Sequence, residues 1–184
     1  MEKNRIATNF LILGGFSTAA FLLYNKFKMT KNFNWSEVSR SGTADSLGIN
    51  NEPNDEQKAN AKRLAVKVLQ PVRSYLNKPI SVTSWFRSPE LNQAIGGSAS
   101  SHHMQGNAAD LKINGNNGDI WKAILLSGVP FTELIIEFGT LDNPEWVHVA
   151  YNGRNERKIL RAERNAFGGV RYATINENNL RLIV

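Results

Sequence analysis

Residues 101–113 read SHHMQGNAADLKI, two histidines and a glycine turn followed by a predicted strand at residues 108–113. Successive side chains of a strand face opposite sides. Asp110 therefore lies on the face opposite the apolar alanine, leucine and isoleucine that alternate with it. An aspartate in the middle of a strand requires a cation or hydrogen-bond donors if it is buried, so its surroundings decide what this strand does.

A second predicted strand, residues 146–151, carries the last of the chain's three histidines. Its alternation places His148 on one face, with Trp146 beside it as a candidate substrate-binding neighbour. A lone histidine there is most often a satisfied core residue. However, Asp110 shows the same pattern of one ligand-type side chain per strand, and His103 precedes it across a glycine turn. Two nitrogens and one carboxylate oxygen suit Zn²⁺ and leave a fourth position for water, as hydrolysis requires.

Three further residues are candidates for this site. Glu145 stands three residues before His148, and positions i and i+3 of an ideal strand face opposite ways. It can therefore reach the attacking water only from the edge of the strand, after the turn at Pro144. Glu137 is either a partner for a ligand imidazole or part of a solvated strand face. Ser101 either hydrogen-bonds a substrate or a metal ligand, or packs within its loop.

Two motifs in the chain resemble the signature of the zinc D-Ala-D-Ala carboxypeptidases and dipeptidases and of the related phage endolysins, which share the Hedgehog-type fold. The motifs are Ser101-x-His103-x-x-Gly106-x-Ala108-x-Asp110 and Glu145-x-x-His148. Residues 83–92 and 33–76 add to the likeness, which spans roughly residues 33–151. Two features depart from it: Trp85-Phe86 stands where many relatives have Gly-Tyr, and the basic tail after Asn152 is less characteristic.

The resemblance implies a role for each matching residue. It implies zinc binding by His103, Asp110 and His148, a general base at Glu145, and stabilisation of the reacting carbonyl by Arg87. The spacing to the glycine and the aspartate selects His103 over its neighbour His102 as the ligand. Arg87, planar and permanently charged, suits an oxyanion or a substrate carboxylate, and the alternative is a surface arginine in a loop.

The composition restricts the class of protein. The 184 residues are enough for one domain with a core, and the absence of cysteine excludes disulfides and thiolate metal sites. A pI near 9.7 does not indicate nucleic-acid binding, because the basic residues concentrate at the two ends. Residues 1–31 carry five basic side chains and one acidic, and residues 154–184 carry seven and three. The middle is slightly acidic, so we predict no nucleic-acid partner.

The N-terminus contains an uncharged run of 19 residues, 6–24, close to the roughly 20 needed to cross a bilayer as a helix. The run ends in large apolar residues and then turns basic, which favours an uncleaved, single-pass membrane anchor. A cleaved signal peptide and a soluble helix are the alternatives. Basic residues flank both ends in similar number, so the positive-inside rule does not decide the orientation.

We predict an α+β fold with a mostly antiparallel sheet and flanking helices. Asn54 caps a helix whose apolar residues recur on one face up to Val72, and Pro71 should kink or end it. Further elements are predicted as strands at 80–84, 108–113, 134–138 and 146–151, helices at 88–95 and 118–126, and a hairpin at 159–162 and 170–175. The domains are a membrane anchor at 1–31, a zinc peptidase domain at 32–153, and a basic C-terminal hairpin extension packed on that domain at 154–184.

The candidate zinc site predicts a metal-dependent hydrolase, and the resemblance to the D-Ala-D-Ala carboxypeptidases and endolysins implies a zinc metallopeptidase that hydrolyses peptide bonds of peptidoglycan. It would act as a D,D-carboxypeptidase or an endopeptidase, in wall remodelling or in phage lysis or entry. Its partners would be peptidoglycan peptides, the membrane, and virion or envelope proteins. Its catalytic domain would face the bacterial cell wall in the periplasm or be carried in a phage particle. The alternative is a non-catalytic wall-binding or virion-structural domain that retains the fold.

Overall fold

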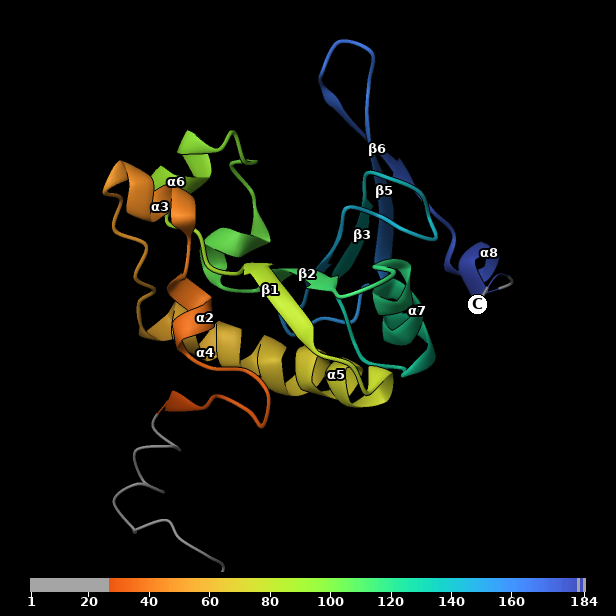
Figure 1. The fold of residues 1–184 in the computed structure, drawn as a ribbon, viewed down its shortest axis with the longest axis horizontal. Helices are drawn as coiled ribbons and strands as arrows, with labels where there is room; N and C mark the ends of the chain where they lie inside the picture. Colours follow the sequence, from red (N-terminus) through yellow and green to blue (C-terminus); the bar gives the residue numbers. More distant parts are fainter. Residues whose placement is uncertain (1–26, 182, 184) are drawn as a thin grey trace, which may run out of the picture.

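The computed structural model describes residues 27–181 and 183. Within them, six strands form one sheet in the order β1-β2-β4-β3-β5-β6 (Figure 1). The strands are β1 (Ile80–Ser84), β2 (Ala108–Ile113), β3 (Glu133–Glu137), β4 (Trp146–Ala150), β5 (Lys158–Arg164) and β6 (Val170–Thr174). Neighbouring strands are antiparallel except β3 and β5, which are parallel. The predicted α+β fold with a mostly antiparallel sheet is therefore confirmed.

Helices flank the sheet and connect its strands. They are α2 (Ser36–Ser39), α3 (Gly42–Leu47), α4 (Asp55–Leu64), the π-helix η1 (Ala65–Leu69), α5 (Gln70–Leu76), α6 (Pro89–Ala94), the 3₁₀-helix η2 (His102–Gln105), α7 (Gly118–Leu126) and α8 (Glu177–Arg181). The segment from α4 to α5 is one long helical stretch (Figure 1). Its buried side chains belong to the same hydrophobic core as those of β2, β3 and β4, and α7 contacts α5, β2 and β4.

The long helical stretch begins where the sequence predicts. The Asn54 side chain accepts a hydrogen bond from the Gln57 backbone N–H, and the Gln57 side chain accepts one from the Asn54 N–H, which completes a capping box. The sequence predicts that Pro71 kinks or ends the helix. The helix does not end there, because the chain stays helical to Leu76. The preceding turn is π-helical, and this wider turn accommodates a proline that has no N–H and crowds the turn before it.

The two faces of the sheet differ in chemistry. Leu111, Leu134 and Val147 are fully buried in the core on the helical side. On the other face, β2 and β4 place Asp110 directly opposite His148. The alternation predicted from the sequence therefore separates a hydrophobic face, which the helices cover, from a face that carries ligand-type side chains.

The C-terminal hairpin is part of the same sheet. β5 and β6 pair antiparallel, and their turn contains Gly168 at φ +80°. Because β5 also pairs with β3, the hairpin of β5 and β6 extends the sheet instead of packing on it from outside. The following helix α8 buries Leu180 in the core, and Arg157 binds the Glu177 carboxylate with two hydrogen bonds of 2.7 and 2.8 Å.

The predicted membrane anchor at residues 6–24 lies outside the described residues. In the part of the chain that the structure describes, no helix has both the length and the apolar character needed to cross a membrane. The anchor therefore stays a prediction.

We predict that Leu64→Ala lowers the free energy of unfolding by about 2–5 kcal/mol, because it leaves a cavity in the core. Leu64 is fully buried in α4, whereas Leu47 at the end of α3 is 60% exposed. Leu47→Ala is thus a matched control, for which we expect a change within about 0.5 kcal/mol. Urea unfolding followed by tryptophan fluorescence measures both values. Equal effects of the two substitutions would contradict the placement of Leu64 in the core.

Candidate metal centre and cleft

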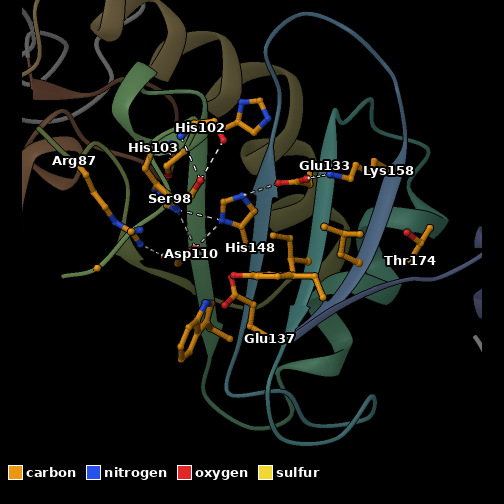
Figure 2. A pocket seen from close by; sticks show the side chains of 18 residues that line it. Arg87, Ser98, His102, His103, Asp110, Glu133, Glu137, His148, Lys158 and Thr174 are labelled. Carbon is orange, nitrogen blue, oxygen red and sulfur yellow. Dashed lines mark hydrogen bonds and ion pairs between the residues drawn. The ribbon is translucent and has the colours of Figure 1, made fainter. Parts of the chain in front are cut away.

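Three buried side chains from three elements converge on one point: His103 in η2, Asp110 in β2 and His148 in β4 (Figure 2). His103 Nε2 lies 3.2 Å from Asp110 Oδ1 and 3.1 Å from His148 Nδ1. His148 Nδ1 lies 3.0 Å from the same Asp110 oxygen. The three donor atoms therefore form a nearly equilateral triangle.

This triangle has the dimensions of one face of a metal coordination tetrahedron. Zinc–ligand bonds of about 2.0–2.1 Å place neighbouring donor atoms roughly 3.3 Å apart in a tetrahedron. The edges of 3.0–3.2 Å come within a few tenths of an ångström of that value. Two imidazoles and one carboxylate leave a fourth position for water or substrate. The residues therefore fit a divalent metal ion.

Gly106 sets the path of the chain between the first two ligands. It ends η2 with φ +71°, and its N–H bonds back to the His103 carbonyl. A Cβ at this position would lie 2.5 Å from the backbone oxygen of Gln57 in α4. Only glycine fits both the left-handed conformation and the close approach of α4, which explains the glycine of the sequence motif.

Contacts behind the ligands orient the first two donor groups. His103 Nδ1 lies 2.5 Å from the Trp85 carbonyl oxygen, so Nδ1 carries the proton and Nε2 is available to a metal. Arg87 Nη2 donates a hydrogen bond of 2.5 Å to Asp110 Oδ2, and Arg87 Nε donates one of 2.8 Å to Ser84 Oγ. Arg87 thus holds one carboxylate oxygen of Asp110 and leaves the other to face the two imidazoles.

The third ligand is supported by Glu133, which the sequence analysis missed. Glu133 Oε1 lies 4.0 Å from His148 Nε2, and its other oxygen accepts a hydrogen bond of 2.8 Å from Lys158. The sequence suggests Glu137 for this role, and the strand predicted at 134–138 begins one residue after Glu133. Strand alternation is the sequence signal that identifies Glu133. Glu133 and Glu137 share a face with Ile135, and Ile135 lies directly opposite His148.

The electrostatics of the triad keep a carboxylate between two imidazoles. Burial lowers the pKa of His103, although Asp110 opposes this shift. Burial acts to raise the pKa of Asp110, but the two histidines outweigh it and hold that pKa well below its ordinary value. Burial acts to lower the pKa of His148, but the hydrogen bond and charge of Asp110 raise it overall. An ionised aspartate in this position is suited to binding a cation.

The triad lies in an open cleft of about 820 Å³. The glycine- and serine-rich loop before η2 lines one side, and side chains of β3, β5 and β6 line the other. Figure 2 shows His148 in the middle of this cleft, with Arg87 and Ser98 on the loop side and Lys158 and Thr174 on the hairpin side. An extended peptide therefore has a wall on each side of the candidate metal position.

Several residues singled out from the sequence line this cleft. Ser101, Glu137 and Trp146 all contribute to its surface. The Ser101 hydroxyl also accepts a hydrogen bond from the His103 backbone N–H and so caps η2. His102 lines the cleft as well but is not part of the triad, in agreement with the choice of His103 from the motif spacing.

The structure does not bring Glu145 into the cleft. Its side chain is 43% exposed, and its carboxylate accepts hydrogen bonds of 2.6 and 3.0 Å from Arg164. These hydrogen bonds lower the pKa of Glu145. The physical reason is strand alternation: β4 turns Trp146 and His148 toward the cleft, so the residue just before the strand points elsewhere. A general base at residue 145 would have to lie at the edge of β4 with its carboxylate turned into the cleft. Glu145 does not lie in that position.

Glu137 is a second glutamate, besides Glu133, on the face of the sheet that carries the triad. It projects from β3 on the same face of the sheet as His148 and lines the cleft (Figure 2). Burial raises the pKa of Glu137 to about 6; His148 opposes this shift and the charge of Asp110 adds to it. A carboxyl group that titrates near neutrality can accept a proton and return it, which are the properties of a general base.

A His-Asp-His triad in an open cleft, with a carboxyl group of raised pKa beside it, is the arrangement of a metal-dependent hydrolase site. The family model described as Peptidase M15 matches residues 31–150, well over half of the chain. The chain therefore belongs to the Peptidase M15 family, which confirms the resemblance seen in the motifs. The match includes all three candidate ligands and ends before β5. No curated protein matches the chain.

We predict that His103→Ala and His148→Ala each abolish stoichiometric Zn²⁺ binding, because two remaining ligands do not complete the site. His102→Ala is the matched control and should bind Zn²⁺ as the wild type does. Equilibrium dialysis followed by elemental analysis measures the metal content of each variant. Loss of zinc from His102→Ala, with zinc retained by His103→Ala, would reverse the assignment of the ligand.

Proposed function

We propose that this protein is a zinc-dependent peptidase that hydrolyses peptide bonds of peptidoglycan. The observation that carries the proposal is the triangle of His103, Asp110 and His148 in an open cleft, with Glu137 beside it. Membership of the Peptidase M15 family supports hydrolysis of a peptide bond. The motif resemblance to D-Ala-D-Ala carboxypeptidases and endolysins supports the substrate class.

Glu137 acts as the general base in this proposal. Zn²⁺ bound by the triad would polarise the scissile carbonyl and lower the pKa of the attacking water. Glu137 accepts a proton from that water and delivers it to the leaving amine. Its pKa of about 6 keeps the carboxylate largely ionised at neutral pH yet able to hold a proton. Glu137 thus takes the role that the motif alignment implied for Glu145.

The remaining polar groups position the reacting atoms. Arg87 is only 17% exposed and is fixed by Asp110 at the wall of the cleft. Its permanent charge lies where it can stabilise negative charge that develops on the scissile carbonyl. Glu133 lies 4.0 Å from His148 Nε2, the separation of a long ion pair, and forms a closer ion pair with Lys158. The site therefore separates groups that orient ligands from the one carboxylate that moves a proton.

We also propose that residues 6–24 tether the peptidase to a membrane as a single-pass anchor. The uncharged run between basic flanks supports this location. The domain would then act on the cell wall from the periplasmic side of a bacterial membrane, or after delivery by a phage particle. Envelope or virion proteins would be its neighbours in the two cases.

We predict that Glu137→Gln lowers kcat by about 10²–10⁴-fold and leaves zinc binding intact, because an amide cannot accept the proton. Glu145→Gln makes the same chemical change at the exposed ion pair with Arg164 and should change kcat by less than about threefold. Rates of muropeptide hydrolysis by the zinc-loaded variants provide the comparison. If Glu145→Gln were inactive and Glu137→Gln were active, Glu145 and not Glu137 would be the general base.

We predict that the purified protein releases peptides from isolated peptidoglycan, that a chelator stops the release, and that added Zn²⁺ restores it. Mass analysis of the products identifies the bond. Loss of a terminal alanine indicates a carboxypeptidase, and conversion of cross-linked dimers to monomers indicates an endopeptidase. Binding of the zinc-loaded protein to peptidoglycan without any release would contradict the proposal and favour a wall-binding domain.

A further inference from the structure

The last strand of the sheet brings a hydroxyl group to the cleft. Tyr172 lies in β6, beyond residues 31–150 that match the family. It lines the cleft and is 54% exposed. Its hydroxyl has no hydrogen-bond partner among residues 27–181 and 183. A donor without a partner at the wall of a substrate cleft is available to a ligand.

The register of the sheet aligns Tyr172 with the proposed base. Glu137 in β3 pairs with Ala162 in β5, and Ala162 pairs with Tyr172. Neighbouring strands lie about 4.8 Å apart, so a single strand separates the two residues. That strand presents only a methyl group at this position, and Ala162 is fully buried. Glu137 and Tyr172 therefore lie on the same face of the sheet, on either side of the small Ala162, and both line the cleft.

The electrostatics of Tyr172 agree with this placement. Burial raises the pKa of the Tyr172 hydroxyl, and the negative charges of Glu137, Glu133 and Asp110 add to the shift. All three carboxylates line the cleft. The hydroxyl therefore stays protonated at neutral pH, which makes it a neutral hydrogen-bond donor on the hairpin side of the cleft.

Donors on the two sides of the cleft differ in what they already bind. On the loop side, Arg87 is held by Asp110 and Ser84. On the hairpin side, Lys158 is held by Glu133, whereas the Tyr172 hydroxyl is bound to none of the described residues. The hairpin wall thus offers the Tyr172 ring with its unengaged hydroxyl to whatever lies in the cleft, and the Thr174 hydroxyl, which also has no partner among the described residues, lines the same wall.

We propose that Tyr172 binds the peptide substrate on the hairpin side of the cleft. Its hydroxyl donates a hydrogen bond to a carbonyl or carboxylate oxygen of the peptide, and its ring packs against the peptide backbone. This inference rests on the proposed function, because its ligand is the peptide that Glu137 helps to cleave. Binding selectivity then comes partly from the β5–β6 hairpin, a segment outside the region that matches the family.

The test removes the hydroxyl and keeps the ring. For Tyr172→Phe in the zinc-loaded full-length chain, we expect KM for cross-linked muropeptides to rise about 3- to 10-fold, as for loss of one hydrogen bond, with kcat within about twofold. Tyr172→Ala, which also removes the ring, should raise KM further. Tyr75→Phe is the matched control, because Tyr75 is equally exposed at 54% but lies in α5, away from the cleft.

A binding measurement separates this inference from the proposed function. Isothermal titration of the same muropeptides into zinc-loaded Glu137→Gln, with and without Tyr172→Phe, gives Kd without turnover. Equal Kd and KM in the presence and absence of the hydroxyl would overturn the role of Tyr172, while wild-type hydrolysis leaves the proposed function standing. If the wild type cleaves no muropeptide, the proposed function fails, and the Kd values alone test the role of Tyr172. Weaker binding by Tyr172→Phe then supports that role, and equal or undetectable binding overturns it.

Discussion

The pairing of Asp110 with His148 across β2 and β4 is the interaction on which the rest of the site depends. Burial of an ionised carboxylate costs several kcal/mol unless hydrogen bonds and opposite charge compensate it. Asp110 is compensated by His103, His148 and Arg87. This polar cluster occupies one face of the sheet, and the helices and the hydrophobic core lie on the other face. The cleft lies on the face of the cluster, where a metal ion and a substrate can reach it.

Elements far apart in the chain keep the donor atoms in place. The Trp85 carbonyl after β1 sets the tautomer of His103, Arg87 selects the free oxygen of Asp110, and Glu133 in β3 backs His148. Gly106 permits the turn that brings the first ligand next to the second. These outer contacts orient the ligands before any metal is bound, which reduces the rearrangement that metal binding requires.

The three glutamates near the centre differ in their cationic neighbours, and this difference separates their roles. Glu133 is paired with Lys158 and supports a ligand, and Glu145 is paired with Arg164 outside the cleft. Glu137 has no ion-pair partner among the described residues, and burial raises its pKa. Chemically identical side chains thus differ in their surroundings, and the raised pKa of Glu137 suits the role of base that we propose for it.

The sequence by itself determined the strands that carry Asp110 and His148, the capped helix at Asn54 and the choice of His103 over His102 as a candidate ligand. Strand alternation, helix capping and motif spacing are local properties, so neighbouring residues are enough to read them. Only the tertiary structure decided which glutamate lies beside the triad and which strand forms the far wall of the cleft. Both depend on long-range pairing: β3 pairs with β4 so that Glu137 shares a sheet face with His148, and the parallel pairing of β3 with β5 brings the hairpin to the site. Local patterns do not encode the register between distant strands, and that register places the proposed base and the hairpin wall around one metal position.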